Sequence, residues 1–453
     1  MPAPQNKSRA IPRWWIWFFA LLAVFTASLA VVVKGFHLFS SIRDEPFIQG
    51  ADDSHYYLWL RSWVVDGDLD FTNDFAAIPF LEPDYKERIL NGPRTATGMV
   101  PNKFPVGWAV VSAPGFATAH LLSKALGWED NGFGAPYQLA VWLQQILMAG
   151  VGFLLLRSIL RRWYSNPVCV LAIMMVWLTS PMVYYQTARI AMVHNTLFVL
   201  GTLVFWLALR VRDCLGSRDR RSMTELASLS GLAGFAAGLM VICRPSAIVY
   251  LIPPVWLIID GMYRNARGSP GLLTAMGAGA IAGAAAGVFP QLLAWKQVYG
   301  HWIYYSYQGE GFNWASPQFY TSLLSPHHGL FNWHPMLALG LGGLLLASLR
   351  GKFTPSWLIS FIAIAWINSA WHMVHFGSAF GGRAYEFVVF FATLGMAYAL
   401  HQLQRRAVFL HATLALHALL ACWNTVFMYL FMQGIVSREE PVTWLERFSA
   451  VFR

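Results

Sequence analysis

The chain has 453 residues, of which 57% are hydrophobic, 15% aromatic and only 12% charged. Soluble globular domains contain about 25% charged residues, so this composition excludes an ordinary soluble protein. It indicates a protein that crosses a membrane several times. The formal net charge is +10, but the basic residues are scattered among hydrophobic stretches. We therefore expect them to set membrane topology, and we expect no nucleic-acid partner.

The first apolar stretch, residues 14–34, can cross roughly 30 Å of hydrocarbon as a helix. No small-residue cleavage site follows it, so we expect a retained transmembrane helix. Further apolar runs cover residues 136–156, 167–185, 191–209, 225–242, 246–260, 272–295, 333–349, 354–371, 384–401 and 407–432. Together they predict a single-domain, all-α polytopic membrane protein with about eleven transmembrane helices.

One more apolar stretch, residues 105–123, is ambiguous, and positive charge decides its placement. If this stretch lies in the interface or re-enters the membrane, most basic clusters fall inside and most acids outside. The clusters placed inside are Lys7/Arg9/Arg13, Arg157/Arg161/Arg162, Arg210/Arg212/Arg218/Arg220/Arg221, Arg264/Arg267, Arg350/Lys352 and Arg405/Arg406. This topology puts the amino terminus inside and the carboxyl terminus outside.

The outer face then carries two long elements, and long structured loops on one side usually have a function. Residues 35–135 are acidic at first and then rich in Pro, Gly and aromatics, and we expect interfacial helices there. Residues 296–332 are rich in Tyr, Trp and His. The remaining predicted parts are the membrane segments 136–295 and 333–432 and an outer tail, 433–453. The Gly/Ala-rich run 271–288 predicts close helix packing.

Two adjacent acids, Asp52 and Asp53, follow the first helix in this otherwise apolar chain. Carboxylates at a membrane surface are costly to desolvate, so they usually face water, a metal or a substrate. We expect the chemistry of the protein to lie here.

Each outer turn also contributes a cation near a predicted helix end. The four are Lys103, Arg189, Arg244 and Arg383. Long basic side chains can simply reach the lipid headgroups. However, the outer face is poor in basic residues, and an anionic ligand such as a lipid phosphate would explain those that remain.

Histidines recur on the same side, at positions 55, 194, 327, 328, 334, 372 and 375. The pairs His327-His328 and His372-x-x-His375 have spacing compatible with a metal, but no HExxH frame surrounds them. We assign no metal ligand and leave a divalent metal open. The four cysteines, Cys169, Cys214, Cys243 and Cys422, are isolated and indicate neither a disulfide framework nor a metal knuckle.

An aromatic stretch, residues 302–314, contains Glu310 and Asn313. It has two interpretations. Interfacial belts of Trp and Tyr are common in membrane proteins. Aromatic rings beside polar groups also suit carbohydrate faces, so both interpretations stay open.

The run ADDSHYYLWLRSWVVDGDLDFTND (51–74) resembles the first outer loop of bacterial GT-C membrane glycosyltransferases. These are relatives of the protein O-mannosyltransferases and of the aminoarabinose and galacturonic acid transferases. Three further segments are similar: NKFPVGWAVVSAPGF (102–116), SPHHGLFNWHP (325–335) and FGSAFGGRAYEF (376–387). The family usually has an Asp-Glu pair after the first helix, whereas this chain has Asp53 at the second position. Asp44-Glu45 is a rival pair.

The resemblance implies inverting transfer of a sugar from a polyprenyl-phosphate donor to an acceptor hydroxyl of a glycan, lipid or protein. It implies a site on the outer side of the bacterial inner membrane. Asp52, with Asp53 beside it, is then the general base, and the four cations stabilise the departing lipid phosphate. The residues expected to contact substrates are His55, Tyr56, His194, Glu310, His327, His328, Asn332, His334 and Tyr385.

Two other functions are compatible with the same composition. A lipid or sugar transporter would place ionisable groups in mid-membrane and often shows paired halves, and neither feature is visible here. A lipid-linked glycan ligase or polymerase would share the substrates, but it would depend on arginines in a large late loop.

Overall fold

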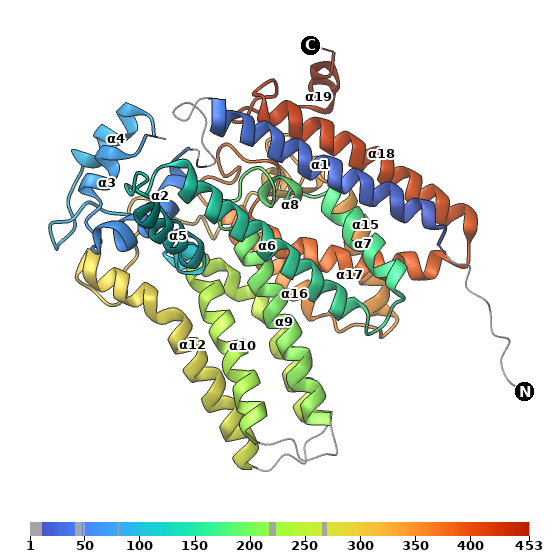
Figure 1. Cartoon of the computed structure of the whole chain (residues 1–453). Helices are drawn as coiled ribbons and strands as arrows, with labels where there is room; N and C mark the ends of the chain where they lie inside the picture. Colours follow the sequence, from blue (N-terminus) through green and yellow to red (C-terminus); the bar gives the residue numbers. More distant parts are fainter. Residues whose placement is uncertain are drawn as a thin grey trace, which may run out of the picture. The chain divides into compact units, whose positions relative to one another are not determined.

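The computed structural model describes residues 11–40, 48, 50–79, 81–216, 223–264 and 270–452. These residues form helices and connecting loops, with no β-strand among them (Figure 1). Backbone contacts divide the chain into two compact units. Unit 1 comprises Met1–Ala30, Phe153–Tyr184 and Asn313–Arg453, and unit 2 comprises Val31–Gly152 and Tyr185–Phe312. The single domain expected from the sequence stays a prediction.

Unit 2 contains residues 35–135, the long segment that follows the first helix and is predicted to lie outside. Its helices are α2 (Gly50–Arg61), the π-helical turn η1 (Ser62–Asp66), α3 (Thr72–Ala77), α4 (Pro83–Leu90), α5 (Gly107–Leu126), α9 (His194–Gly216), α10 (Met223–Cys243), the 3-10 helix η2 (Pro245–Leu251), α11 (Ile252–Arg264) and α12 (Pro270–Tyr299). Three helices contribute to both units: α1 (Arg13–Ser40), α6 (Ala135–Leu160) and α8 (Met182–Tyr185). The described part of residues 35–135 therefore contains several helices, and their place at the membrane interface stays a prediction.

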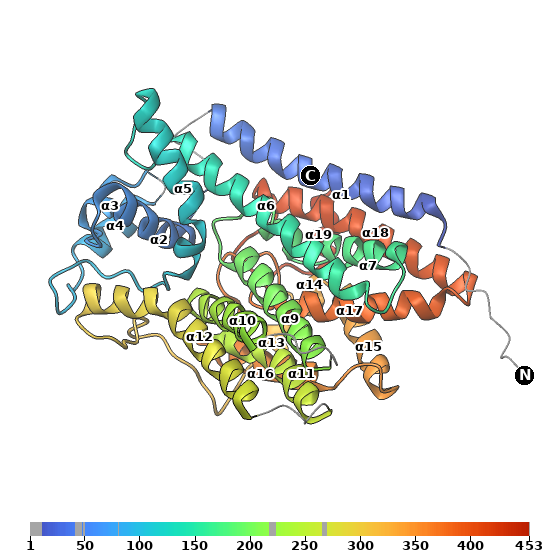
Figure 2. The ribbon, with the colours of Figure 1, turned by 60° about the horizontal axis from the view of Figure 1, so that its bottom comes forward.

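Helices α10 and α12 lie side by side over much of their length (Figures 1 and 2). A Cβ atom added at Gly283 would lie 1.9 Å from the carbonyl oxygen of Gly231, and one at Gly234 would lie 2.1 Å from that of Ala280. Only glycine allows the two backbones to approach this closely. The prediction that residues 271–288 mark close helix packing is confirmed.

The start of α5 packs against the end of α10 in the same way. A Cβ at Gly107 would lie 2.5 Å from the backbone nitrogen of Cys243. In addition, the amide of Val106 donates a 2.9 Å hydrogen bond to Gln291 Oε1 of α12. These contacts fix the loop that carries Lys103 close to Arg244, the residue that follows α10.

Unit 1 contains the carboxyl-terminal third of the chain. Its helices are α7 (Asn166–Leu178), α13 (Phe319–Leu323), α14 (Leu330–Trp333), α15 (Met336–Leu349), α16 (Ser356–Ala370), α17 (Glu386–Leu403), α18 (Ala407–Met432) and α19 (Trp444–Ala450). Helix α17 is almost entirely buried, and its Gly395 approaches the Gly340 carbonyl of α15 so closely that a Cβ would lie 1.9 Å away. The unit-1 part of α1 runs along α18, where the hydroxyls of Thr26 and Thr425 lie 2.8 Å apart.

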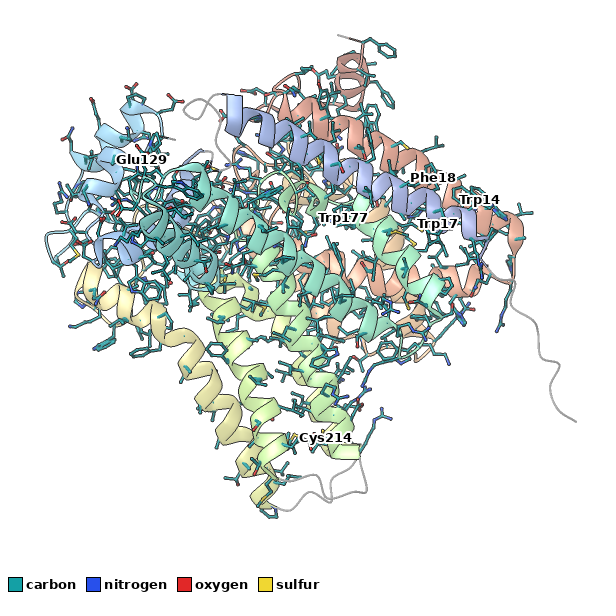
Figure 3. The ribbon with its side chains drawn as sticks, viewed as in Figure 1. Trp14, Trp17, Phe18, Glu129, Trp177 and Cys214 are labelled. Carbon is teal, nitrogen blue, oxygen red and sulfur yellow. The ribbon has the colours of Figure 1, made fainter. Side chains whose placement is uncertain are left out.

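Seven helices in the described part of the chain are long and apolar enough to cross a membrane, and α7, α15 and α16 are shorter apolar helices. On α1, Trp14 and Trp17 are 55% and 67% exposed (Figure 3), which suits contact with lipid. The polytopic, all-helical fold is thus confirmed. Residues 107–123 of the ambiguous stretch lie in α5, which is not one of these seven. The count of about eleven crossings and their orientation stay predictions.

Candidate active site

The acidic pair after α1 lies on α2, where its two members have different surroundings. Asp53 is fully buried, and its Oδ2 accepts a 3.1 Å hydrogen bond from Nε of Arg189. Arg189 itself is only 8% exposed. Asp52 is half-buried. The pair therefore divides into a carboxylate that holds a cation and one that lies nearer the surface.

Asp52 lies within electrostatic reach of two phenols from other segments. Burial raises the pKa of Tyr85 to about 12, and the nearby Asp52 carboxylate adds to that shift. Desolvation also raises the pKa of Tyr307, and Tyr56, Asp52 and Glu310 raise it further while Arg244 lowers it. Asp52 of α2, Tyr85 of α4 and Tyr307 of the second outer loop therefore form one cluster.

Two of the expected cations adjoin this cluster. Lys103 forms an ion pair with Glu310, and its Nζ lies 5.5 and 5.6 Å from the ring centroids of Phe104 and Tyr307. Arg244, half-buried at the end of α10, acts electrostatically on Tyr307. The residues predicted as a phosphate-binding cation and as a substrate contact, Lys103 and Glu310, are thus partners in the structure.

Hydrogen bonds join the two loops of unit 2 that are predicted to lie outside. The Ser306 hydroxyl donates to the Lys103 carbonyl at 2.6 Å, and the Tyr299 hydroxyl donates to the Asn102 carbonyl at 2.9 Å. Because each bond joins segments about 200 residues apart, the loops support one another, and the cluster does not depend on either loop alone.

His55 lies one helical turn beyond Asp52 and is buried between two polar side chains. Its Nδ1 lies 3.0 Å from Asn102 Oδ1, and its Nε2 lies 3.0 Å from the Tyr85 hydroxyl. Burial lowers the pKa of His55 to about 4, an effect opposed by the Asn102 hydrogen bond. His55 is therefore neutral at physiological pH and cannot supply a fixed positive charge.

Two other expected substrate contacts of unit 2 are buried. Tyr56 is 5% exposed and packs edge-on to Phe104, with 5.2 Å between ring centroids. His194, at the start of α9, is fully buried, and its ring lies 4.3 Å from that of Tyr185. Their place in the structure favours a supporting role, and substrate contact by either stays a prediction.

A second polar group lies in unit 1. The rings of His327 and His375 stack 4.1 Å apart, and the ring of His328 lies 5.1 Å from that of His327. Burial lowers the pKa of His328 to about 3, and His327, His375 and Arg383 lower it further. The segment that carries Arg383 is held close by a 2.7 Å hydrogen bond from the Gly382 amide to the His328 carbonyl. Arg383 therefore shares its surroundings with these histidines.

Three expected substrate contacts of unit 1 have internal partners. The hydroxyl of buried Tyr385 lies 2.5 Å from that of Ser322. Asn332 Oδ1 accepts a 2.9 Å hydrogen bond from Arg447 of α19. His334 is 1% exposed and packs against Phe380. These contacts stabilise the unit, and substrate binding by the three residues stays a prediction.

Within the described residues, no group of three or more His, Cys, Asp or Glu side chains is placed to hold a metal ion. The rival acids Asp44 and Glu45 lie outside the described residues.

Sequence reasoning missed Tyr85, Asn102 and Tyr307. Asn102 directly precedes Lys103 in a segment that carried the family resemblance. Tyr307 lies in the aromatic stretch that had two open interpretations. Tyr85 lies on α4, a helix without buried residues, and no local pattern marks it.

No protein-family model matches this sequence, and no curated protein matches it. Several solved structures are similar to it. An oligosaccharyltransferase from Archaeoglobus fulgidus, solved with Zn and sulfate, is similar with a TM-score of 0.50 and 13% identity, over 93% of this chain and 54% of that one. The oligosaccharyltransferase AglB from the same organism, solved with an inhibitory peptide and a dolichol-phosphate, has a TM-score of 0.49 and 12% identity, over 94% and 57%. ArnT from Cupriavidus metallidurans, in the apo state, has a TM-score of 0.48 and 14% identity, over 93% and 71%.

The chain thus spans only 54% and 57% of the two oligosaccharyltransferases. At these identities the likeness concerns the fold alone. That fold is of the GT-C type, as the sequence predicted.

Proposed function

We propose that this protein is an inverting glycosyltransferase that moves a sugar from a polyprenyl-phosphate donor to an acceptor hydroxyl at the outer face of the membrane. The observation that carries the proposal is the cluster in unit 2, where Lys103 pairs with Glu310 and lies 5.6 Å from the Tyr307 ring, and where Asp52 and Arg244 both act electrostatically on Tyr307. A carboxylate and fixed cations on neighbouring segments are the two components that this reaction requires. The GT-C type fold supports the same reaction class.

The reaction assigns a separate task to each component. The acceptor O–H gives its proton to the Asp52 carboxylate as the acceptor oxygen forms a bond to the anomeric carbon. The bond between that carbon and the phosphate oxygen breaks, and its electron pair leaves with the polyprenyl phosphate. Attack from the opposite face inverts the anomeric centre. A sugar phosphate ester has a good leaving group, so the reaction depends on the base and on stabilisation of the phosphate.

Asp53 and Arg189 are proposed to act together on the donor side. The buried Asp53 carboxylate accepts a hydrogen bond from Arg189 Nε and so fixes the direction of the guanidinium group. Arg189 Nη2 lies against Gly50, where an added Cβ would be 3.4 Å away. Gly50 has a φ of +68°, a left-handed conformation that glycine adopts without strain, and it begins α2 beside this guanidinium. Asp53 is therefore assigned to orient Arg189, and Asp52 to the proton transfer.

Lys103 and Glu310 are proposed to form an exchangeable pair. Their side chains are 35% and 23% exposed, so solvent and ligands can reach them. A phosphate that approaches Lys103 would compete with Glu310 for the Lys103 ammonium. Arg244 would add a second positive charge near the phosphate. For unit 1, Arg383 is proposed to bind phosphate, and His327 and His328 are proposed to contact substrate.

Purified protein in lipid nanodiscs tests the function directly. A panel of radiolabelled sugars on polyprenyl phosphate is incubated with membrane glycolipids, and the anomeric configuration of the product is read by NMR. We expect transfer with inversion for at least one donor, and the same activity in Glu129→Gln, an exposed acid of the same outer segment (Figure 3). If the sugar lipid moves across the bilayer of liposomes without transfer, the transporter alternative replaces this proposal.

A further inference from the structure

The hydrogen-bond chain Asn102–His55–Tyr85 has a fixed direction. Asn102 Nδ2 donates to the backbone carbonyl of His55 at 2.9 Å, and Asn102 Oδ1 accepts from the backbone amide of Phe104 at 3.3 Å. A backbone carbonyl can only accept and an amide can only donate. The two main-chain groups therefore determine which side of the Asn102 amide is oxygen, and that oxygen faces His55 Nδ1.

The direction continues through the imidazole ring. A neutral histidine has one donor and one acceptor nitrogen. Because Asn102 Oδ1 can only accept, His55 Nδ1 carries the proton, and Nε2 is left as an acceptor. The Tyr85 hydroxyl, 3.0 Å from Nε2, must then donate its proton to His55. The raised pKa of Tyr85, about 12, keeps that proton in place at physiological pH.

This direction decides what the outer side of Tyr85 can bind. Because the Tyr85 hydroxyl donates its one proton to His55, the phenol oxygen can only accept further hydrogen bonds. In the part of the chain that the structure describes, His55 is the one hydrogen-bond partner of this oxygen, and Tyr85 is half-buried, so a ligand can reach it. Asp52 and Glu310, which act on this phenol, are carboxylates and also accept hydrogen bonds.

We infer that Tyr85 Oη, together with Asp52, forms a subsite for a ligand group that donates hydrogen bonds, namely a hydroxyl of the acceptor sugar next to the hydroxyl that reacts. This inference rests on the proposed function, in which Asp52 takes the proton of the reacting hydroxyl. The Asp52 carboxylate then accepts a hydrogen bond from the hydroxyl that reacts, and Tyr85 Oη accepts one from the adjacent hydroxyl. Tyr85 is a specificity residue that selects acceptors with adjacent hydroxyls.

Nitrogen NMR tests the direction of the hydrogen bonds from Tyr85 through His55 to Asn102, and it requires no turnover. The full-length protein is labelled with ¹⁵N-histidine in nanodiscs, and the His55 signals are assigned by their loss in His55→Gln. We expect a neutral ring protonated at Nδ1, with Nε2 hydrogen-bonded. Tyr85→Phe should shift the Nε2 signal toward that of a free acceptor nitrogen, whereas Tyr320→Phe, at an exposed tyrosine, should not. A ring protonated at Nε2 would overturn the inference.

The same signal reports the ligand. Methyl glycosides and their monodeoxy derivatives are added as probes, because a hydroxyl that donates to Tyr85 Oη strengthens the bond from Tyr85 to Nε2. At least one glycoside should shift the Nε2 signal, its derivative without one hydroxyl should not, and Tyr85→Phe should abolish the difference. In the transfer reaction, Tyr85→Phe should raise the acceptor KM about tenfold and leave donor binding unchanged.

The two proposals fail in different ways. If no glycoside shifts the Nε2 signal in the wild-type protein, the subsite is refuted even where transfer is observed. If the shifts are seen but no donor supports transfer, the subsite stands as a sugar site and the proposed reaction is wrong.

Discussion

Arg189 Nε lies 3.1 Å from Asp53 Oδ2, although 136 residues separate the two in sequence. Both side chains are almost completely buried. A buried ion pair costs desolvation energy, and it is a weak source of stability compared with apolar packing. Its presence here is explained if the pair has a function, which in our account is to hold a cation in a fixed orientation toward the lipid phosphate.

Removal of Asp53 should destabilise the protein because it leaves the Arg189 charge buried without its carboxylate. For Asp53→Ala we expect a loss of about 3–5 kcal/mol in the free energy of unfolding, visible as a lower Tm in detergent. Asp66→Ala is a suitable comparison, since its partner Arg61 also pairs with buried Asp74. An unchanged Tm in Asp53→Ala would show that the ion pair does not form.

The pH dependence of stability should reveal the buried imidazole of His55. Its pKa falls from an ordinary 6.5 to about 4 on folding, so the unfolded chain binds the additional proton between these values. Stability due to this group is complete above pH 6.5 and is lost as the pH falls toward 4, by up to about 3 kcal/mol. Burial raises the pKa of Asp74 to about 6, which has the opposite effect over this range. The difference between wild type and His55→Gln isolates His55, and identical pH profiles would contradict its neutral state.

Arg383 distinguishes a ligand-binding role from contact with lipid headgroups. If it binds the donor phosphate through a bidentate fork, Arg383→Lys should impair donor binding, because an ammonium is a point charge. We expect Kd for polyprenyl phosphate to rise about tenfold in the variant. Arg350→Lys, a predicted cytoplasmic position, serves as control. Unchanged donor binding in both Arg383→Lys and Arg383→Ala would remove Arg383 from the site.

The predicted topology can be tested by thiol labelling in intact cells. In a background where the four native cysteines are serine, a cysteine at exposed Ser316 should react with a membrane-impermeant reagent. A cysteine at Ser217, which lies outside the described residues, should not react until the membrane is opened. The reverse pattern would place the acidic cluster on the cytoplasmic side.

Sequence patterns identified the helices because transmembrane length and apolar composition are local properties. The glycines of residues 271–288 also predicted close helix packing, because glycine at four-residue spacing allows two membrane helices to approach closely. The structure identifies α10 as the partner of α12. Boundaries were less accurate. Helix α12 continues to Tyr299, beyond the expected end at residue 295, because apolar composition does not mark the residue at which a helix ends.

The partners within the site could not be read from the sequence. Lys103 and Glu310 were assigned to different ligands, and the structure pairs them across 207 residues. Charge at one membrane face predicted that both lie outside, but it could not predict which groups meet, since that depends on how α5, α10 and α12 pack. Tyr85 was missed for the same reason, because its role follows from a ring 30 residues earlier in the chain.

The most direct test of the account is the turnover of Asp52→Asn in nanodiscs, measured with donor binding on the same sample. Asparagine keeps the shape of aspartate but cannot take the acceptor proton. Turnover should fall by about two to four orders of magnitude, while Kd for the donor should stay within about twofold of wild type. Near-normal turnover in Asp52→Asn would contradict the account, and abolished turnover in Asp44→Asn would then assign the base to Asp44.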